Sequence, residues 1–195
     1  MIHHNIEQNT EIWMDLRKGK FTASSFKDLF MVKTTAGYRN AMYKVVFEKL
    51  TGEQPESFSN DYMQRGHELE PLAREFYEQE TFNEVLDPGF FELNEWVGAS
   101  PDGLIGDDGL IEIKCPAYGT MIQYLIDKEL PAQYKWQVYG QMWVTGRKWC
   151  HFMAYHPNLK PIIIRIERDE VIINELTVKI NEAIEHAKNI IKKIS

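Results

Sequence analysis

The sequence has too few cysteines to stabilise a small fold through disulfides, and it has no long apolar run. Its 195 residues include two cysteines, Cys115 and Cys150, which cannot build a disulfide framework or a four-thiolate cluster. No apolar stretch approaches the roughly 20 residues that cross a bilayer. Residues 1–5 lack the basic-then-apolar order of a secretory signal. We therefore expect an intracellular, cytoplasmic protein without membrane contact and with both thiols free.

Basic residues are also scarce, because 22 Lys and Arg stand against 29 Asp and Glu, for a net charge of −7. Such a surplus of negative charge opposes general binding to phosphates. The charges are unevenly distributed, however. Residues 1–50 carry eight basic and five acidic side chains, whereas residues 51–100 carry two and twelve. This suits an enzyme that holds a polyanion with one part and metal ions with another, although surface charge is often uneven without any such function.

The hydrophobic share of 44% is that of an ordinary globular protein, and we predict a single domain over residues 1–195. Apolar spacing predicts helices at residues 10–18, 22–30, 38–50, 61–79, 120–126, 132–144 and 172–194. Pro71 should kink the fourth of these or begin a new helix. Short segments rich in β-branched and aromatic residues predict strands at residues 90–93, 97–100, 103–105, 110–114, 149–155 and 162–166, the last one buried. The fold class is therefore α/β, with one mixed central sheet flanked by helices.

One predicted hairpin brings carboxylates together. Strand side chains alternate, so Glu112 and Lys114 share one face while Ile111 and Ile113 face the other, which we expect to be the core. The preceding strand returns antiparallel and can place Asp102 close to Glu112. Two neighbouring carboxylates repel each other unless a hard cation such as Mg²⁺ or Mn²⁺ lies between them. A Glu-x-Lys triplet alone is typical of a surface ion pair on a strand, and the spatially paired Asp102 is what favours a metal site.

These residues resemble a known motif. Asp102 with Glu112-Ile113-Lys114 resembles the PD-(D/E)xK nuclease motif, and longer strings are similar to the lambda-exonuclease, or YqaJ-type viral recombinase, family. The matching strings are Arg17-Lys18-Gly19 with Thr22-Ala23-Ser24, Arg65-Gly66 with Glu70, Ser100-Pro101-Asp102-Gly103, Glu112-Ile113-Lys114-Cys115-Pro116, and Tyr134 and Gln137 with Met142-Trp143-Val144-Thr145. The five ordered motifs span about residues 11–170. The resemblance implies a restriction-endonuclease-like fold.

The resemblance also implies roles at the site of cleavage. Mg²⁺ or Mn²⁺, as two ions, would be bound by Asp102, Glu112, the backbone carbonyl of Ile113, and Glu70. Lys114 would contact the attacking water, and Gln137 would orient Lys114 or the water. His67, three residues before Glu70, could approach a metal, although a histidine there is more often solvated.

A second implied set binds DNA. Arg17 and Ser24 correspond to residues that hold the terminal 5′-phosphate in the resembling enzymes, and Ser100 and Tyr134 could add hydrogen bonds to the phosphate or the strand. Where the lambda enzyme has a further arginine, this sequence has Thr120. That contact is either absent or supplied by Lys128 or Lys135.

The function implied is a 5′-to-3′ exonuclease acting on double-stranded DNA ends. The resembling enzymes are toroidal trimers of phage or prophage origin, and they supply 3′ overhangs to a single-strand-annealing recombinase. The sequence leaves two alternatives open. One is a site- or structure-specific endonuclease of the same fold. The other is a DNA-binding module without catalysis, against which intact Asp102, Glu112 and Lys114 argue.

Overall fold

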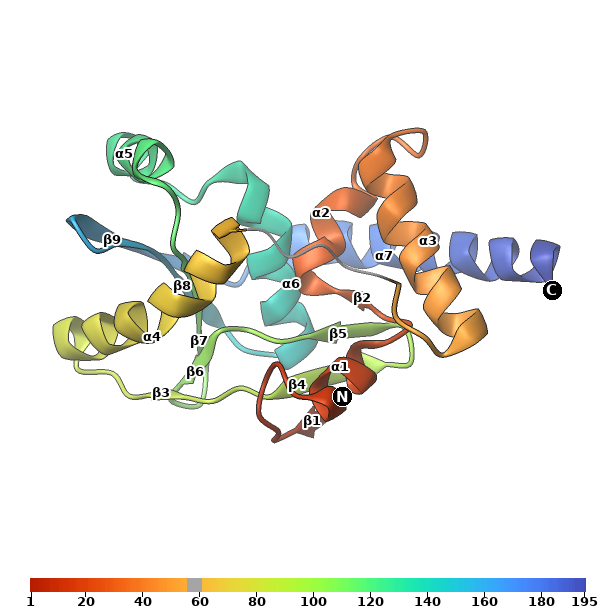
Figure 1. Ribbon diagram of the computed structural model, residues 1–195, viewed down its shortest axis with the longest axis horizontal. Helices are drawn as coiled ribbons and strands as arrows, with labels where there is room; N and C mark the ends of the chain where they lie inside the picture. The colour runs from red at the N-terminus through yellow and green to blue at the C-terminus, as the bar shows by residue number, and fades with distance from the viewer. Residues whose placement is uncertain (56–60) are drawn as a thin grey trace.

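The strands form two mixed sheets in residues 1–55 and 61–195, which are the residues that the computed structural model describes; side chains are described for residues 1–55 and 64–195 (Figure 1). The smaller sheet has the order β1 (Ile2–His4), β4 (Phe90–Asn94), β5 (Val97–Ala99), β2 (Phe21–Thr22). The larger has the order β3 (Val85–Leu86), β6 (Gly103–Ile105), β7 (Gly109–Lys114), β8 (Trp149–His156), β9 (Leu159–Glu167). Neighbours are antiparallel except for β2 with β5 and β7 with β8.

The predicted fold class is confirmed, with the strands divided between two sheets. The chain passes from one sheet to the other between β5 and β6, at residues 100–102. Pro101 lies at the centre of this passage, and a proline has no N–H to donate to a ladder. The interruption places Asp102 at the junction of the two sheets, directly before β6.

Six of the seven predicted helices are present with small differences at their ends, and the one predicted at residues 22–30 is wrong in part, because it starts as a strand and a 3₁₀ turn and is α-helical over residues 26–29 alone. The helices are α1 (Glu11–Arg17), α2 (Phe26–Leu29), α3 (Ala36–Thr51), α4 (Asp61–Thr81), α5 (Tyr118–Asp127), α6 (Lys135–Thr145) and α7 (Glu170–Ile194), with 3₁₀ turns η1 (Ala23–Ser25) before α2 and η2 (Ala132–Tyr134) before α6. The N-terminus of α1 is capped by Thr10, which accepts a hydrogen bond from the Trp13 N–H. Helix α4 continues through Pro71, so no new helix begins there. None of the described helices combines the length and apolarity needed to cross a membrane.

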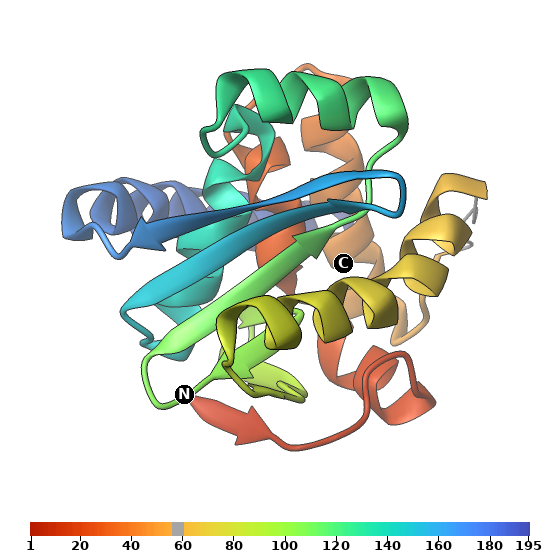
Figure 2. The same cartoon turned by 90° about the vertical axis from the view of Figure 1, so that its left-hand side faces the viewer.

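Both faces of β7 are covered. Ile111 and Ile113 pack against Ala73 and Tyr77 of α4 on one side. On the other side, Leu110 belongs to the larger core, to which α3, α6 and α7 contribute. Figure 2 shows α4 in front, beside β7, while α6 and α7 lie behind the larger sheet. The side chain at position 112 therefore points into the interior, toward α6.

The expectation of a buried strand at residues 162–166 is wrong in part. Strand β9 is an edge strand that pairs with β8 alone. Ile162, Ile163 and Ile164 are only half-buried, and Ile166 is the residue of this run that is buried. An apolar run indicates a strand, but its burial depends on which neighbours cover the edge of the sheet.

Candidate active site

The hairpin of β6 and β7 holds Asp102 against the backbone of the next strand. Gly103 pairs with Ile111, and the Asp102 N–H donates to the Ile111 carbonyl at 3.1 Å. The Asp102 carboxylate in turn accepts from the Ile113 N–H, with Oδ2 to N at 2.6 Å. A Cβ at position 103 would lie 2.2 Å from Val85 Cγ1, so glycine is required where β3, β6 and β7 converge. These contacts fix the position of the Asp102 side chain.

Glu112 is fully buried and surrounded by hydrogen-bond donors from α6 and from its own strand. Gln137 Nε2 donates to Oε1 at 2.5 Å, and Gln141 Nε2 donates to Oε2 at 2.5 Å. The Lys114 ammonium forms an ion pair with Oε1. The expected pairing of Glu112 and Lys114 on one face is confirmed, and that face meets α6.

A cavity of about 390 Å³ opens in front of these residues. Its walls are Gly66, His67, Glu70, Asp102, Ile113, Lys114, Cys115, Pro116 and Tyr134. Helix α4 supplies Glu70 from across the cavity. Arg65 on the same helix donates to the carbonyls of Cys115 at 2.9 Å and Pro116 at 3.2 Å, which ties α4 to the loop after β7.

The charges around this cavity perturb one another. Burial raises the pKa of Asp102 well above its ordinary value, and the nearby Glu112 and Glu70 raise it further. The pKa of Glu70 is raised for the same reasons, first by burial and then by Glu112, with Lys114 opposing the change. Burial alone would lower the pKa of Lys114, but Glu112 and Asp102 outweigh it, and the pKa is raised. The lysine is therefore held protonated and can act as a donor.

The residues around the cavity fit a hard divalent cation. Asp102 and Glu70 present oxygen donors to the same space, and their mutual repulsion is what a cation would offset. Glu112 lies directly behind, with its oxygens already hydrogen-bonded to α6. No group of three or more His, Cys, Asp or Glu side chains is arranged as a metal cluster in the described part of the chain. The ligand set of Asp102, Glu112, Ile113 and Glu70 thus stays a prediction that the geometry supports through its oxygen-donor chemistry.

A neighbouring cavity of about 170 Å³ contains the predicted phosphate-binding residues. Its walls are Gln8, Asn9, Trp13, Arg17, Thr22, Ala23, Ser24, His67, Glu70, Ser100, Asp102 and Gln137. Arg17, Ser24 and Ser100 therefore share a cavity. Three members of the cleavage site, namely Glu70, Asp102 and Gln137, form part of the same wall.

Ser100 is oriented by two donors in this smaller cavity. Trp13 Nε1 donates to Ser100 Oγ at 3.0 Å, and Arg17 Nη1 donates to the same atom at 3.1 Å. Since the oxygen of Ser100 accepts twice, its own hydroxyl proton is free to be donated to another acceptor. Burial lowers the pKa of Arg17 to about 10, with Glu48 opposing the change, so the guanidinium stays charged at neutral pH. The cavity thus presents donors and positive charge, as an anion site requires.

Several other predicted contacts lie elsewhere. Tyr134 lines the larger cavity, where Lys114 Nζ lies 5.5 Å from the centre of its ring. Thr120 lines a separate hollow beside α5. Lys128 caps the end of α5, and Lys135 covers the Trp136 ring at 4.4 Å. None of these four lines the cavity with Arg17.

The sequence prediction did not include some residues that the structure places at the site. Gln8 donates to the carbonyls of Gly89 at 3.2 Å and Pro101 at 2.9 Å, which links the N-terminal segment to the residue before Asp102. Asn9 adopts φ 64 next to it. Such contacts join distant parts of the chain, so no local pattern signals them. Gln141 could have been found, because it lies four residues after Gln137 and hence on the same helical face.

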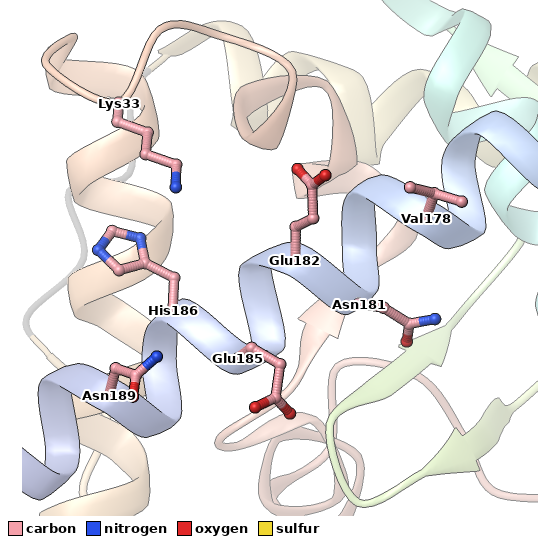
Figure 3. Close-up of a pocket in the computed structure, with 7 residues that line it drawn as sticks. All are labelled: Lys33, Val178, Asn181, Glu182, Glu185, His186 and Asn189. Carbon is pink, nitrogen blue, oxygen red and sulfur yellow. The ribbon is translucent and has the colours of Figure 1, made fainter.

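A further hollow, of about 600 Å³, lies over α7 and away from these residues (Figure 3). In Figure 3 the Lys33 side chain points toward α7, from which Glu182 and His186 extend in different directions. Tyr38 Oη lies 2.9 Å from His186 Nδ1, and Tyr38 is buried. None of the predicted site residues lines this hollow, and it has no role in the chemistry considered above.

Comparisons with known proteins identify a family and a fold. A family model described as the YqaJ-like viral recombinase domain matches residues 12–148. An alkaline exonuclease (LHK-Exo) from Laribacter hongkongensis shares 38% sequence identity with this chain. Its crystal structure superposes with a TM-score of 0.88, and the match covers 95% of this chain and 96% of that chain. The same enzyme in complex with dAMP gives a TM-score of 0.89. No curated protein matches the chain.

A more distant structure shows the same fold. The phage-related exonuclease from Haemophilus somnus 129PT is 18% identical, with a TM-score of 0.72 and coverage of 93% of this chain and 100% of that chain. Together with the family match, the 38% identical alkaline exonuclease supports a nuclease.

Proposed function

This chain belongs to the YqaJ-like viral recombinase domain family, and on that premise we propose that it is a metal-dependent 5′-to-3′ exonuclease. It would degrade one strand of linear double-stranded DNA from a 5′-phosphorylated end and leave 3′ overhangs. One observation carries the proposal. The cavity that holds Arg17, Ser24 and Ser100 also has Asp102 and Glu70 in its wall. A terminal phosphate bound there would lie at a set distance from the residues that cleave.

The roles of the side chains follow from their positions. Mg²⁺ or Mn²⁺, as two ions, would be held by Asp102, Glu70, Glu112 and the Ile113 carbonyl; such an ion polarises the phosphodiester and lowers the pKa of a bound water. Lys114, held protonated, would donate to the attacking water or to a phosphate oxygen and offset the charge that develops there. Gln137 orients Glu112 and thereby Lys114.

The terminal phosphate would be bound by a different set. Arg17 supplies a charged guanidinium, and the Ser100 hydroxyl is free to donate because Trp13 and Arg17 occupy its oxygen. Ser24 is exposed on η1 and adds a second hydroxyl. These groups give the phosphate charge-assisted hydrogen bonds, which are about twice as strong as neutral ones.

The wider assembly is also part of the proposal. Following the resemblance, the chain would form a homotrimer around the duplex inside a bacterial host cell, and would pass its 3′ overhangs to a single-strand-annealing recombinase. The family description as a viral recombinase domain supports the link to recombination. Light scattering of the purified protein would give a mass about three times that of the chain.

Three DNA substrates test the function. A blunt linear duplex with 5′-phosphates should be degraded in the presence of Mg²⁺, one with 5′-hydroxyls more slowly, and a covalently closed circle not at all. End labelling should show loss from the 5′ end, and EDTA should stop the reaction. Lys114→Ala protein serves as the inactive control. Rapid cutting of the closed circle would point to an endonuclease and would contradict the proposal.

A further inference from the structure

Gln141 lies on the buried side of α6, one helical turn after Gln137, and none of its side chain is exposed. Its Nε2 donates to Glu112 Oε2 at 2.5 Å, while Gln137 and Lys114 serve Oε1. The two carboxylate oxygens thus have separate supports. Gln141 is the one donor that the side chains supply to Oε2 in the described part of the chain.

Burying the amide of Gln141 at this position costs folding free energy. Its Oε1 is buried and has no hydrogen-bond partner among the described residues. Neighbouring positions on α6, such as Val138, Met142 and Val144, are buried and apolar. An apolar residue at 141 would leave no oxygen stranded, so packing alone does not explain a glutamine. Its bond to Glu112 is the contact that does.

The charge on Glu112 also fixes the direction of the amide. If the amide turned over, Oε1 would face an ionised carboxylate, and the NH₂ group would lose its acceptor. The orientation with nitrogen toward Glu112 is therefore the stable one. In this orientation the amide holds the carboxylate from behind, on the α6 side of the sheet.

Gln137 and Gln141 differ in what else they can reach. Gln137 is half-buried and forms part of the wall of the cavity with Arg17, so bound DNA can compete for its amide. Gln141 is fully buried and lines neither this cavity nor the one with Lys114. Within the described residues, the hydrogen bond to Glu112 is the one contact that its amide makes, and no ligand in either cavity would touch it directly.

We propose that Gln141 is a positioning residue that holds Glu112 in its metal-binding orientation through the hydrogen bond to Oε2. This inference rests on the proposed function, because it assumes that Glu112 binds a metal. It adds a residue that acts through Glu112 and touches neither DNA nor the reacting atoms.

The test measures binding of Mn²⁺ alone, without DNA, to the full chain by electron paramagnetic resonance. Gln141→Met keeps the length of the side chain and removes the donor. Its Mn²⁺ affinity should fall about tenfold to a hundredfold, as is usual when a group supporting a metal ligand is lost. The kcat should fall while the KM for DNA stays the same, because the cavity with Arg17 is intact. Val144→Ala, on the same buried helix but away from Glu112, is the control for general loosening of α6.

The outcomes separate the possibilities. Gln141→Met with wild-type Mn²⁺ affinity overturns the inference, and so does an equal loss of affinity in Val144→Ala, which would show a purely structural role. If Gln141→Met does not fold, Gln141→Asn withdraws the amide by one methylene and should show the same loss of affinity. Wild-type protein that binds no Mn²⁺ overturns the proposed metal-dependent function together with this inference. Wild-type binding with unchanged variants overturns the inference alone.

Discussion

Asp102 and Arg17 lie in the walls of the same small cavity, and burial acts on them in opposite directions. It raises the pKa of Asp102 and lowers that of Arg17, so each is pushed toward its neutral form. The charges nearest Asp102 include the carboxylates of Glu112 and Glu70, whereas Arg17 and the Trp13 indole both donate to the Ser100 hydroxyl. One side of the cavity is built for a cation and the other for an anion. The difference predicts that the proposed cleavage and the proposed recognition of the DNA end can be changed separately.

The largest effect on activity should come from a change on the side of the cavity that carries the carboxylates. Asp102→Asn removes a carboxylate charge that is proposed to hold the metal, and it should cost several kcal/mol of transition-state stabilisation, or at least about 10³-fold in kcat. Binding of 5′-phosphorylated duplex should persist, since Arg17 is untouched. Single-turnover cleavage and fluorescence anisotropy measure the two properties. Asp107→Asn, on the exposed turn of the same hairpin, is the matched control. Loss of DNA binding in Asp102→Asn would show that the two sides are not independent.

A smaller and more selective effect on activity should come from a change on the side of the cavity that carries Arg17. Arg17→Ala removes charge-assisted hydrogen bonds worth about 1.5–3 kcal/mol, so cleavage of 5′-phosphorylated ends should fall roughly tenfold to a hundredfold. Ends with a 5′-hydroxyl should be affected little. Lys18→Ala removes a neighbouring cation that pairs with Asp15 and should leave the ratio of the two rates unchanged. Equal loss on both kinds of end would remove the role assigned to Arg17.

Ser24 should contribute less than Arg17 because its hydroxyl is neutral. Ser24→Ala should reduce the preference for 5′-phosphorylated ends by about twofold to tenfold, corresponding to a net hydrogen bond of about 0.5–1.5 kcal/mol. Ser25→Ala provides the comparison, since Ser25 Oγ donates to the Thr22 carbonyl and lines no part of the cavity. Competition between differently labelled ends in one reaction resolves an effect of this size. A larger effect at Ser25 than at Ser24 would contradict the assignment.

The smallest expected effect is on the pH dependence of the free energy of unfolding when no metal is bound. The folded-state pKa of Asp102 lies above its ordinary value of 3.8, so the folded chain binds this proton more tightly than the unfolded chain. That contribution is fully present below about pH 3.8 and is lost as the pH rises through the folded-state pKa. In EDTA, the free energy of unfolding of wild type relative to Asp102→Asn should therefore fall as the pH rises. Mg²⁺ should reverse the trend, and denaturant titrations at several pH values would reveal a flat difference if the idea is wrong.

The arrangement of Asp102, Glu112 and Lys114 was largely predictable from the sequence because it is local. Alternation along β7 places Glu112 and Lys114 on one face, and a short hairpin brings Asp102 alongside. The prediction of an α/β fold succeeded for the same reason, since the amphipathic helices α5 and α7 and strands such as β7 and β8 carry their own local patterns. Arg17, Ser24 and Glu70 came from the resemblance to a family, and the structure brings all three to the same cavity.

The contacts that escaped prediction are those between distant segments. Strands β1, β2 and β3 have two or three residues each, too few for a period to be read. Gln8 reaches Pro101 across 93 positions of the chain. The half-buried state of β9 depends on its place at the sheet edge, which its own residues do not encode.

The sequence by itself determined which chemical groups are available and which of them share a strand or a hairpin, because side-chain direction within an element follows from its geometry. It determined Asp102, Glu112 and Lys114 as a set. The tertiary structure alone decided that Glu112 is fully buried against Gln137 and Gln141, and that the cavity of Arg17 shares a wall with Asp102. Those relations depend on how α4, α6 and the N-terminal segment pack around the junction of the two sheets, and packing is set by the whole chain.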